Sequence, residues 1–247
     1  KFYFIIFLIF IFIYILIYLS GERTALGLIF ISSISILFLV AKFRIFRLIS
    51  IILSILSIIV ISFYFPAVKE RNIDYTIKQL GLNDNSEEVH IFSPEHEKIM
   101  FTAINMFKDN PVIGIGSNNF RNFCSDERYE LIPDESCQTH PHNNYVQALA
   151  EIGVIGMIFL ILPIFYFTRL ILMHLYIKIR KQESLINDYQ ICLIVYFICT
   201  LWPALPTLNL FNNWINIIYY LPVGFYLHSI YSKKNDSSYG KFNHIYK

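Results

Sequence analysis

Apolar residues in this chain are gathered into long blocks that polar loops separate. A bilayer core about 30 Å thick needs roughly 20 apolar residues in a helix, so a block of about that length predicts a membrane-crossing helix. Six blocks approach or reach this length: residues 2–19, 25–41, 48–65, 145–167, 189–205 and 214–231. The pattern therefore predicts an all-α, polytopic integral membrane protein with about six transmembrane helices and one large loop, residues 66–144.

Composition excludes a soluble domain of the same length. Hydrophobic residues make up 55% of the 247 residues and charged residues 15%, against about 45–50% and about 25% in soluble domains. Nothing in this balance points to nucleic acid as a partner.

The basic residues predict which side of the membrane each loop occupies. Lys and Arg in short loops stay in the cytoplasm, and the short basic segments 42–47, 169–181 and 233–247 fall on one side if every block crosses once. The turn 20–24 and the large loop then lie outside. That loop has nearly twice as many carboxylates as basic residues, so it is acidic, although the whole chain has a net charge of +2.

These assignments divide the chain into four parts. Residues 1–65 form three transmembrane helices, 66–144 the outer loop, 145–231 three more helices, and 232–247 a cytoplasmic tail. The first block lacks an Ala-x-Ala cleavage site and has too long an apolar core for a signal peptide. Because the chain starts at Lys1 and enters the membrane at once, we expect a preceding part to be missing.

The outer loop has structure of its own. Residues 69–88 read as a polar helix or an irregular segment. Ser93 and Pro94 then mark a helix start, as cap and first helical residue, and Asp109-Asn110-Pro111 marks its end. Within it an apolar face is formed by Ile99, Ala103, Met106 and Phe107.

Four cysteines fall into two pairs. Cys124 and Cys137 lie in the outer loop, where an oxidising compartment would allow a disulfide, although a free thiol pair would have the same sequence. Cys192 and Cys199 lie seven residues apart in one block, on one helix face, and are interpreted as packing residues.

Candidate chemistry lies where the outer loop re-enters the membrane. His140 and His142 carry the side chain best suited to proton transfer near neutral pH, although a loop histidine is commonly a solvated bystander. A metal site is the alternative, with a set of ligands that has only the His-x-His spacing in its favour. That set is Asp134, Glu135, Cys137, His140 and His142.

Charged residues near the ends of the blocks are further candidates. Arg23 can snorkel, pair with Glu22 or bind a phosphate through paired hydrogen bonds. Arg71 lies at a similar depth beyond the third block, and a solvated charge is its alternative reading. Glu151 lies about two turns into the fourth block, where a carboxylate is costly, so either a functional role or a structural hydrogen bond is expected.

One motif resembles a known family. His142-Asn143, nine residues, Gly153, two residues and Gly156 look like the His-Asn-x9-Gly-x-x-Gly signature of O-antigen ligases. The segments 110–116 and 20–25 are similar to segments of the same family. Members usually have about a dozen spans, so the chain resembles the C-terminal half. The superfamily includes ligases, O-antigen polymerases and protein O-oligosaccharyltransferases.

The resemblance implies a glycosyltransferase in the bacterial inner membrane with its active site facing the periplasm. Such an enzyme moves a glycan from an undecaprenyl-diphosphate carrier to a hydroxyl of lipid A–core, of another glycan or of a protein. It implies no nucleotide, metal or other cofactor. His142 is then the catalytic base and Arg23 and Arg71 bind the diphosphate.

Other residues near these three are candidate substrate ligands, namely Glu22, Asn143 and Glu151. A transporter without catalysis is the competing class. It favours broken helices and polar groups at mid-membrane depth, whereas the charged candidates here gather at the outer ends of the blocks. A purely structural subunit gives no reason for Arg23, Arg71 and His142 to share one face.

Overall fold

The computed structural model describes residues 2–40, 42–82, 89–133, 135–180 and 186–243, and in these residues the only regular secondary structure is helix. This confirms the predicted all-α class. The elements are α1 (Phe2–Ser20), α2 (Arg23–Leu39), α3 (Arg44–Tyr64), α4 (Pro66–Lys69), the π-helical turn η1 (Glu70–Asp74), α5 (Tyr75–Gln79), α6 (Pro94–Asp109), α7 (Phe120–Phe123), α8 (Asn144–Ile179), α9 (Asp188–Thr200) and α10 (Asn213–Asn243).

Several helices suit a membrane interior. Within the described residues, Tyr3–Ser20, Arg44–Tyr64 and Asn144–Ile179 are long and apolar enough to cross it. The apolar helices α2 and α9 are shorter, with 17 and 13 residues. Large apolar side chains are exposed on the bundle, such as Phe63 at 80% and Phe159 at 74%, as expected of a lipid-facing surface. The chain is therefore a membrane protein, while the count of six crossings stays a prediction.

The long helices form two packed groups. In one, α1 contacts both α2 and α3; in the other, α8, α9 and α10 enclose most of the core, and α2 packs against α9 to join the groups. The rings of Phe197 and Tyr226 each lie with their centroids 5.1 Å from that of Phe167. Because α3 precedes the outer loop and α8 follows it, the loop begins on the first group and ends on the second.

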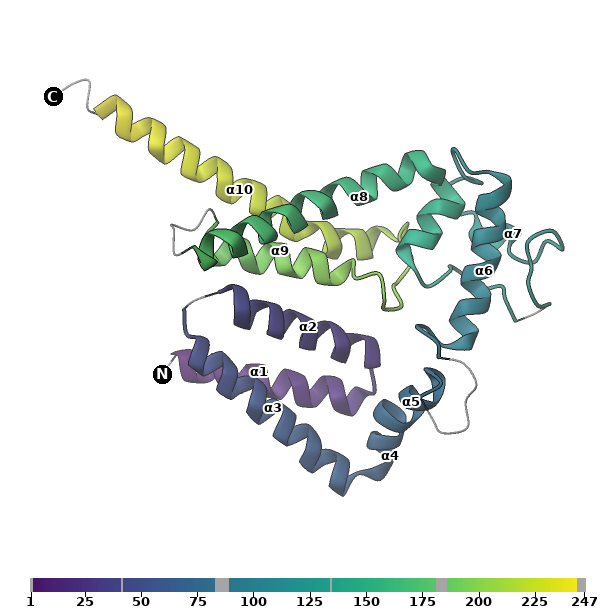
Figure 1. Ribbon diagram of the computed structural model, residues 1–247, viewed down its shortest axis with the longest axis horizontal. Coiled ribbons are helices and arrows are strands. Elements are labelled where there is room, and N and C mark those ends of the chain that lie inside the picture. Colours follow the sequence, from purple (N-terminus) through teal and green to yellow (C-terminus); the bar gives the residue numbers. More distant parts are fainter. Residues whose placement is uncertain (1, 41, 83–88, 134, 181–185, 244–247) are drawn as a thin grey trace.

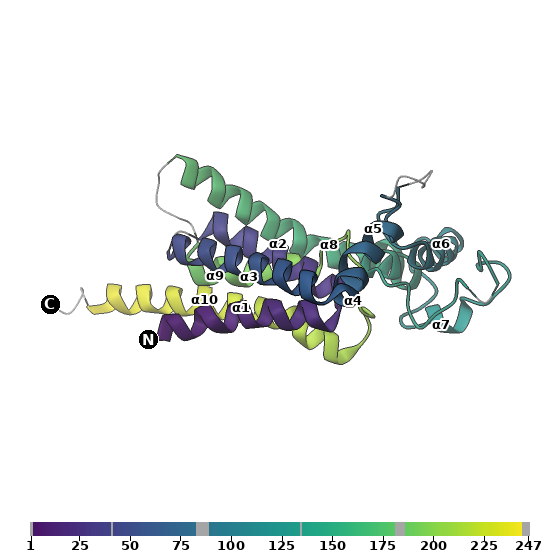
Figure 2. The same ribbon diagram turned by 90° about the horizontal axis from the view of Figure 1, so that it is seen from below.

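Figures 1 and 2 show α4–α7 gathered at one end of the bundle, while the α2–α3 connection, the C-terminal end of α8 and the N-terminus lie toward the other end. Basic side chains cap α2 at that second end. Lys178 Nζ donates to the carbonyls of Phe38 and Leu39 at 2.7 and 2.9 Å, and Arg47 donates to the carbonyl of Val40. Cations at a helix C-terminus are stabilised by the helix dipole.

The outer loop contains the helix that its sequence predicts. Ser93 caps α6, its Oγ accepting from the backbone N–H of His96 at 3.4 Å, and Pro94 is the first helical residue. Of the predicted apolar residues, Ile99, Ala103 and Met106 are buried, and Phe107 is half-buried. The preceding segment is helical as far as Gln79, and residues 83–88 lie outside the described residues.

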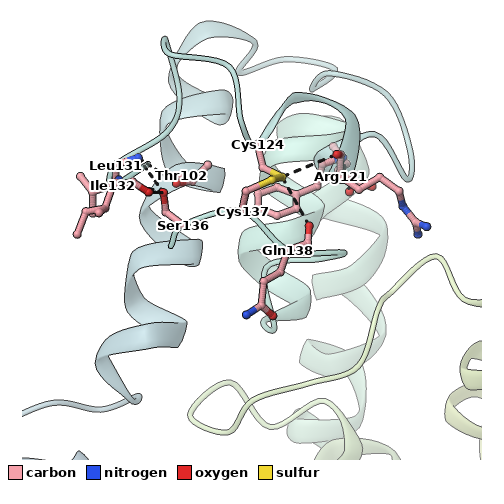
Figure 3. Close-up of a disulfide and its surroundings, with 10 residues drawn as sticks. Thr102, Arg121, Cys124, Leu131, Ile132, Ser136, Cys137 and Gln138 are labelled. Carbon is pink, nitrogen blue, oxygen red and sulfur yellow. Dashed lines mark hydrogen bonds between the residues drawn. A yellow bond between two sulfur atoms is a disulfide. The ribbon is translucent and has the colours of Figure 1, made fainter. Parts of the chain in front are cut away.

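The predicted disulfide between Cys124 and Cys137 is confirmed, with Cα atoms 4.9 Å apart (Figure 3). Cys124 is buried with Phe120 and Tyr129 in a small core built on α6 and the start of α8. The outer loop thus has its own core. Of the other two cysteines, Cys199 is buried and Cys192 is exposed.

Helix α8 is longer than its apolar block and is bent at Gly153, whose φ is +62°. Segment 111–116 lies across the bend: Val154 N–H donates to the carbonyl of Pro111 at 2.9 Å, and Ile115 N–H to that of Ala150 at 3.0 Å. A Cβ on Gly153 would lie 2.4 Å from the backbone of Val112. The first glycine of the signature therefore permits a close backbone crossing that turns the start of α8 toward the outer loop.

Candidate functional site

Arg23 is the first residue of α2 and faces α5. Its Nη1 donates to Gln79 Oε1 at 2.5 Å and to Thr76 Oγ1 at 3.3 Å, and its guanidinium lies 5.3 Å from the centre of the Tyr75 ring. Among the described residues no ion pair joins Arg23 to Glu22, which is exposed. The hydrogen bonds hold Arg23 in place without neutralising its charge.

Arg71 is placed by the π-helical turn η1. The neighbouring Asn72 is buried, and its Nδ2 donates to the carbonyls of Tyr18 and Val68, both at 2.9 Å. This ties the turn to the end of α1. The Arg71 guanidinium then lies over Gly21, where a Cβ would be 2.4 Å from Nε. A π-turn of this kind is frequent at functional sites.

The two arginines share a cavity of about 550 Å³, which opens where α1 turns into α2. It is lined by Gly21, Glu22, Arg23, Thr24, Ala67, Glu70, Arg71 and Tyr75. Within the described residues Arg71 forms no ion pair or hydrogen bond with another side chain. Two guanidinium groups, the type of group that pairs with carboxylate or phosphate, therefore line one cavity together with the carboxylates of Glu22 and Glu70.

His142 lies in the short segment between the disulfide and α8. Its φ is +57°, and its carbonyl accepts a hydrogen bond from Thr207 N–H at 2.8 Å. A left-handed backbone is uncommon for a residue with a side chain and is often kept at functional sites. Its Nε2 forms a hydrogen bond with Gln138 Oε1 at 2.8 Å.

Three histidines gather here. The ring centroid of His142 lies 4.2 Å from that of His140 and 4.7 Å from that of His96 on α6. Burial, and then the neighbouring His140 and His96, lower the pKa of His142 to about 4. Burial also lowers the pKa of His96 and of His140. All three rings are therefore neutral near pH 7, and a neutral imidazole can accept a proton.

Arg23 and His142 line the same larger cavity, of about 720 Å³. His96 lines it too, and its apolar wall includes Tyr196, Trp202 and Tyr219 from α9, α10 and the loop between them. Glu22, Arg23 and Thr24 line both cavities. Arg23 thus stands between the cavity of Arg71 and the cavity of His142. The structure brings together these three predicted residues, which lie far apart in the sequence.

Asn143 is the N-cap residue of α8. Its Oδ1 accepts from Tyr145 N–H at 3.0 Å and from Val146 N–H at 3.2 Å, and its Nδ2 donates to the carbonyl of Pro203 at 3.2 Å. The side chain is buried. These contacts favour a structural role, in which Asn143 starts α8 and ties it to the loop before α10.

Glu151 faces the outer loop and lines neither cavity. It is 1% exposed, and its carboxylate accepts from the backbone N–H groups of Phe120, at 3.0 Å, and Asn118. Gln147 Nε2 lies 3.4 Å from it. These contacts favour the structural alternative: Glu151 holds the loop at the start of α7.

The metal alternative finds no support in the geometry. Cys137 is bonded to Cys124 and so offers no thiolate, and Asp134 lies outside the described residues. Among the described residues, no three His, Cys, Asp or Glu side chains are grouped as metal ligands would be.

Sequence reasoning missed His96 and Gln138. His96 lies three residues before Ile99, so it extends the buried face of α6, and a histidine on such a face is the signal that identifies it. Gln138 carried no signal, because its contact with His142 depends on how the disulfide-bonded segment folds.

An apolar helical bundle with two arginines and three neutral histidines gathered at one end defines this chain as a membrane protein with a candidate polar site. The chain matches the O-antigen ligase family over residues 6–161, and it belongs to that family. The match includes the His142–Gly156 signature and both arginines. The family belongs to lipopolysaccharide biosynthesis. No curated protein and no solved structure matches the chain.

Proposed function

We propose that this protein is a glycosyltransferase that moves a glycan from an undecaprenyl-diphosphate carrier to a hydroxyl of lipid A–core. The observation that carries the proposal is that Arg23 and His142 line one cavity, while Arg71 lines a second cavity that also meets Arg23. The site therefore has a proton acceptor on one side and cations for a diphosphate on the other.

The reaction follows from these side chains. The acceptor oxygen attacks the anomeric carbon of the glycan while neutral His142 takes its proton. The bond from that carbon to the diphosphate oxygen breaks, and the electron pair leaves with the diphosphate. Arg23 and Arg71 stabilise the added negative charge. Attack from the face opposite the leaving group inverts the anomeric carbon.

We propose that no metal ion is needed, because the two guanidinium groups supply the positive charge that the leaving diphosphate requires. Glu22 and Glu70 line the same cavity as the two arginines and are open to solvent. They repel an anion that approaches away from the arginines, and this helps to fix the direction from which the donor enters.

The proposal also fixes topology. The end of the bundle that carries α4–α7 and the two cavities faces the periplasm, across the bacterial inner membrane, and the end where Lys178 and Arg47 cap α2 faces the cytoplasm. The domain division is then residues 1–65, 66–144, 145–231 and 232–247, as predicted. A donor diphosphate at the membrane surface would lie level with both arginines.

Polymerases and protein O-oligosaccharyltransferases of the superfamily use the same donor chemistry, so the acceptor separates the three possibilities. Membranes containing the protein are given a labelled undecaprenyl-diphosphate glycan together with lipid A–core, with a second lipid-linked glycan or with an acceptor protein. The proposal expects label on lipid A–core. Label only on the second glycan, or only on the protein, would mean that this molecule is the acceptor and lipid A–core is not. No transfer to any of the three would contradict the proposal.

A further inference from the structure

The proton-accepting nitrogen of His142 is set by its partner. The Nε2 of His142 lies 2.8 Å from Oε1 of Gln138. A carbonyl-type oxygen has only lone pairs to offer, so Nε2 must carry the hydrogen. We infer that Gln138 is a positioning residue, which fixes the tautomer of His142 and leaves Nδ1 as the atom that takes the acceptor's proton. This inference rests on the proposed function.

The disulfide holds Gln138 where it can do this. Gln138 directly follows Cys137, whose partner Cys124 is anchored in the buried core of the outer loop (Figure 3). On the other side of Cys137, the buried Ser136 Oγ accepts from the backbone N–H groups of Leu131, at 3.1 Å, and Ile132, at 3.0 Å. Gln138 itself is exposed, so its fixed backbone, rather than packing around the amide, determines its position.

The remaining neighbours of His142 orient its ring without supplying a second acceptor for Nε2. His96 approaches from α6 with its ring at 71° to that of His142, and His140 approaches from the same segment at 44°. On His96 the charge of Glu95 acts first and raises its pKa, and that of Arg23 lowers it, while the charge of Arg121 lowers the pKa of His140. In the described part of the chain, His140 and His96 are the titratable groups that act directly on His142.

A neutral amide suits this position. When the acceptor's proton moves to Nδ1, the ring becomes a cation that still donates from Nε2 to Gln138. A carboxylate there would favour the protonated ring strongly, so His142 would hold a proton at higher pH. An amide fixes the tautomer without adding that charge. The orienting partner in a Ser-His-Asp triad fixes the tautomer in the same way but does carry the charge.

Two variants of Gln138 separate these effects. Gln138→Glu keeps an acceptor and adds a charge, so the pH midpoint of His142 should rise. Gln138→Leu removes the acceptor at similar size. It should leave that midpoint low and slow glycan transfer by up to about 10²-fold, the cost of a misplaced group. Both changes are at an exposed position, so both proteins should fold.

Two readouts are used in parallel. The first is the rate at which diethylpyrocarbonate modifies His142 as a function of pH, followed by peptide mass spectrometry in membranes. The second is glycan transfer over the same pH range. The first requires no substrate. A wild-type protein that transfers nothing would therefore refute the proposed function and leave the test of Gln138 standing.

Removing the disulfide provides an independent test of the role of Gln138. Replacing Cys124 and Cys137 together by Ser should slow transfer about as much as Gln138→Leu does, and combining the two should add little further loss. Cys192→Ser, which removes a thiol from α9, is the control and should change nothing. An unchanged midpoint in Gln138→Glu, or wild-type transfer by Gln138→Leu, would overturn the inference.

Discussion

At the level of single residues, the burial of His142 predicts an unusual pH dependence. The pKa of an exposed imidazole is about 6.5, whereas that of His142 is lowered to about 4. The lowered value means that the ring stays neutral, and able to accept a proton, as pH falls from 7 to 5. We expect transfer to persist over that range and to fall as pH approaches 4. An acid limb centred near pH 6.5 would show that an ordinary, exposed histidine limits the reaction.

Arg71 gives the clearest test of diphosphate binding. Because it forms no ion pair or hydrogen bond with another side chain in the described residues, its removal should leave the thermal midpoint of unfolding unchanged. Arg71→Ala should nevertheless lower transfer at limiting donor by roughly 10²-fold, the usual cost of losing one charge-stabilising donor. Arg71→Lys should recover only part of the transfer rate at limiting donor, because an ammonium group cannot make paired hydrogen bonds.

The matched control is Arg128→Ala. Arg128 is an exposed outer-loop arginine whose ion pair is with Asp126, at 2.7 Å. Its loss should not change transfer. Equal donor dependence in the Arg71→Ala, Arg128→Ala and wild-type proteins would mean that Arg71 is a solvated charge.

The site could be predicted from sequence only in part. The signature placed His142, and the order of helices and loops placed Arg23 and Arg71 at one end, because loops between membrane helices must alternate between the two sides. Asn143 and Glu151 lie within the same motif, yet most of their hydrogen bonds are to backbone groups. Spacing along the chain does not reveal which way a polar side chain turns.

At the level of elements, the sequence does not predict the bend in α8, although the signature contains both Gly153 and Gly156. An apolar block has no signal for a bend, because hydropathy is the same on either side of it. The bend depends on segment 111–116, whose backbone crosses α8 at Gly153. By contrast, α6 was predicted accurately because its cap, its apolar face and its terminating Asn-Pro are all local features.

The bend predicts a large effect of a single methyl group. Gly153→Ala should destabilise the protein by more than about 2 kcal/mol, because the left-handed backbone costs about 1–2 kcal/mol for other residues and the new Cβ would meet the backbone of Val112 at 2.4 Å. The measurement is the thermal midpoint of unfolding in lipid nanodiscs.

Gly224→Ala is the matched control, because nothing lies within 4 Å of its Cβ position in α10. It should be neutral or stabilising by about 0.5–1 kcal/mol. If Gly153→Ala were tolerated as well as Gly224→Ala, the close crossing at the bend would be wrong.

At the level of the whole molecule, the arrangement of the loops predicts sidedness. Phe43 lies in the α2–α3 connection and Glu127 in the outer loop, and both are exposed. In a background with Cys192 and Cys199 replaced by Ser, a membrane-impermeant maleimide applied to spheroplasts should label Glu127→Cys. It should label Phe43→Cys only after permeabilisation, and the reverse pattern would place the site in the cytoplasm.

The central claim is that His142 accepts the proton in glycan transfer, and the most direct measurement compares it with His140. The variants His142→Gln and His140→Gln are assayed for transfer from a lipid-linked glycan in membranes with matched protein levels. The account predicts that His142→Gln loses about 10²–10⁴-fold in transfer rate, the usual cost of removing a general base. His140→Gln should keep most of the wild-type transfer rate. Loss only in His140→Gln, or loss in neither, would contradict the account.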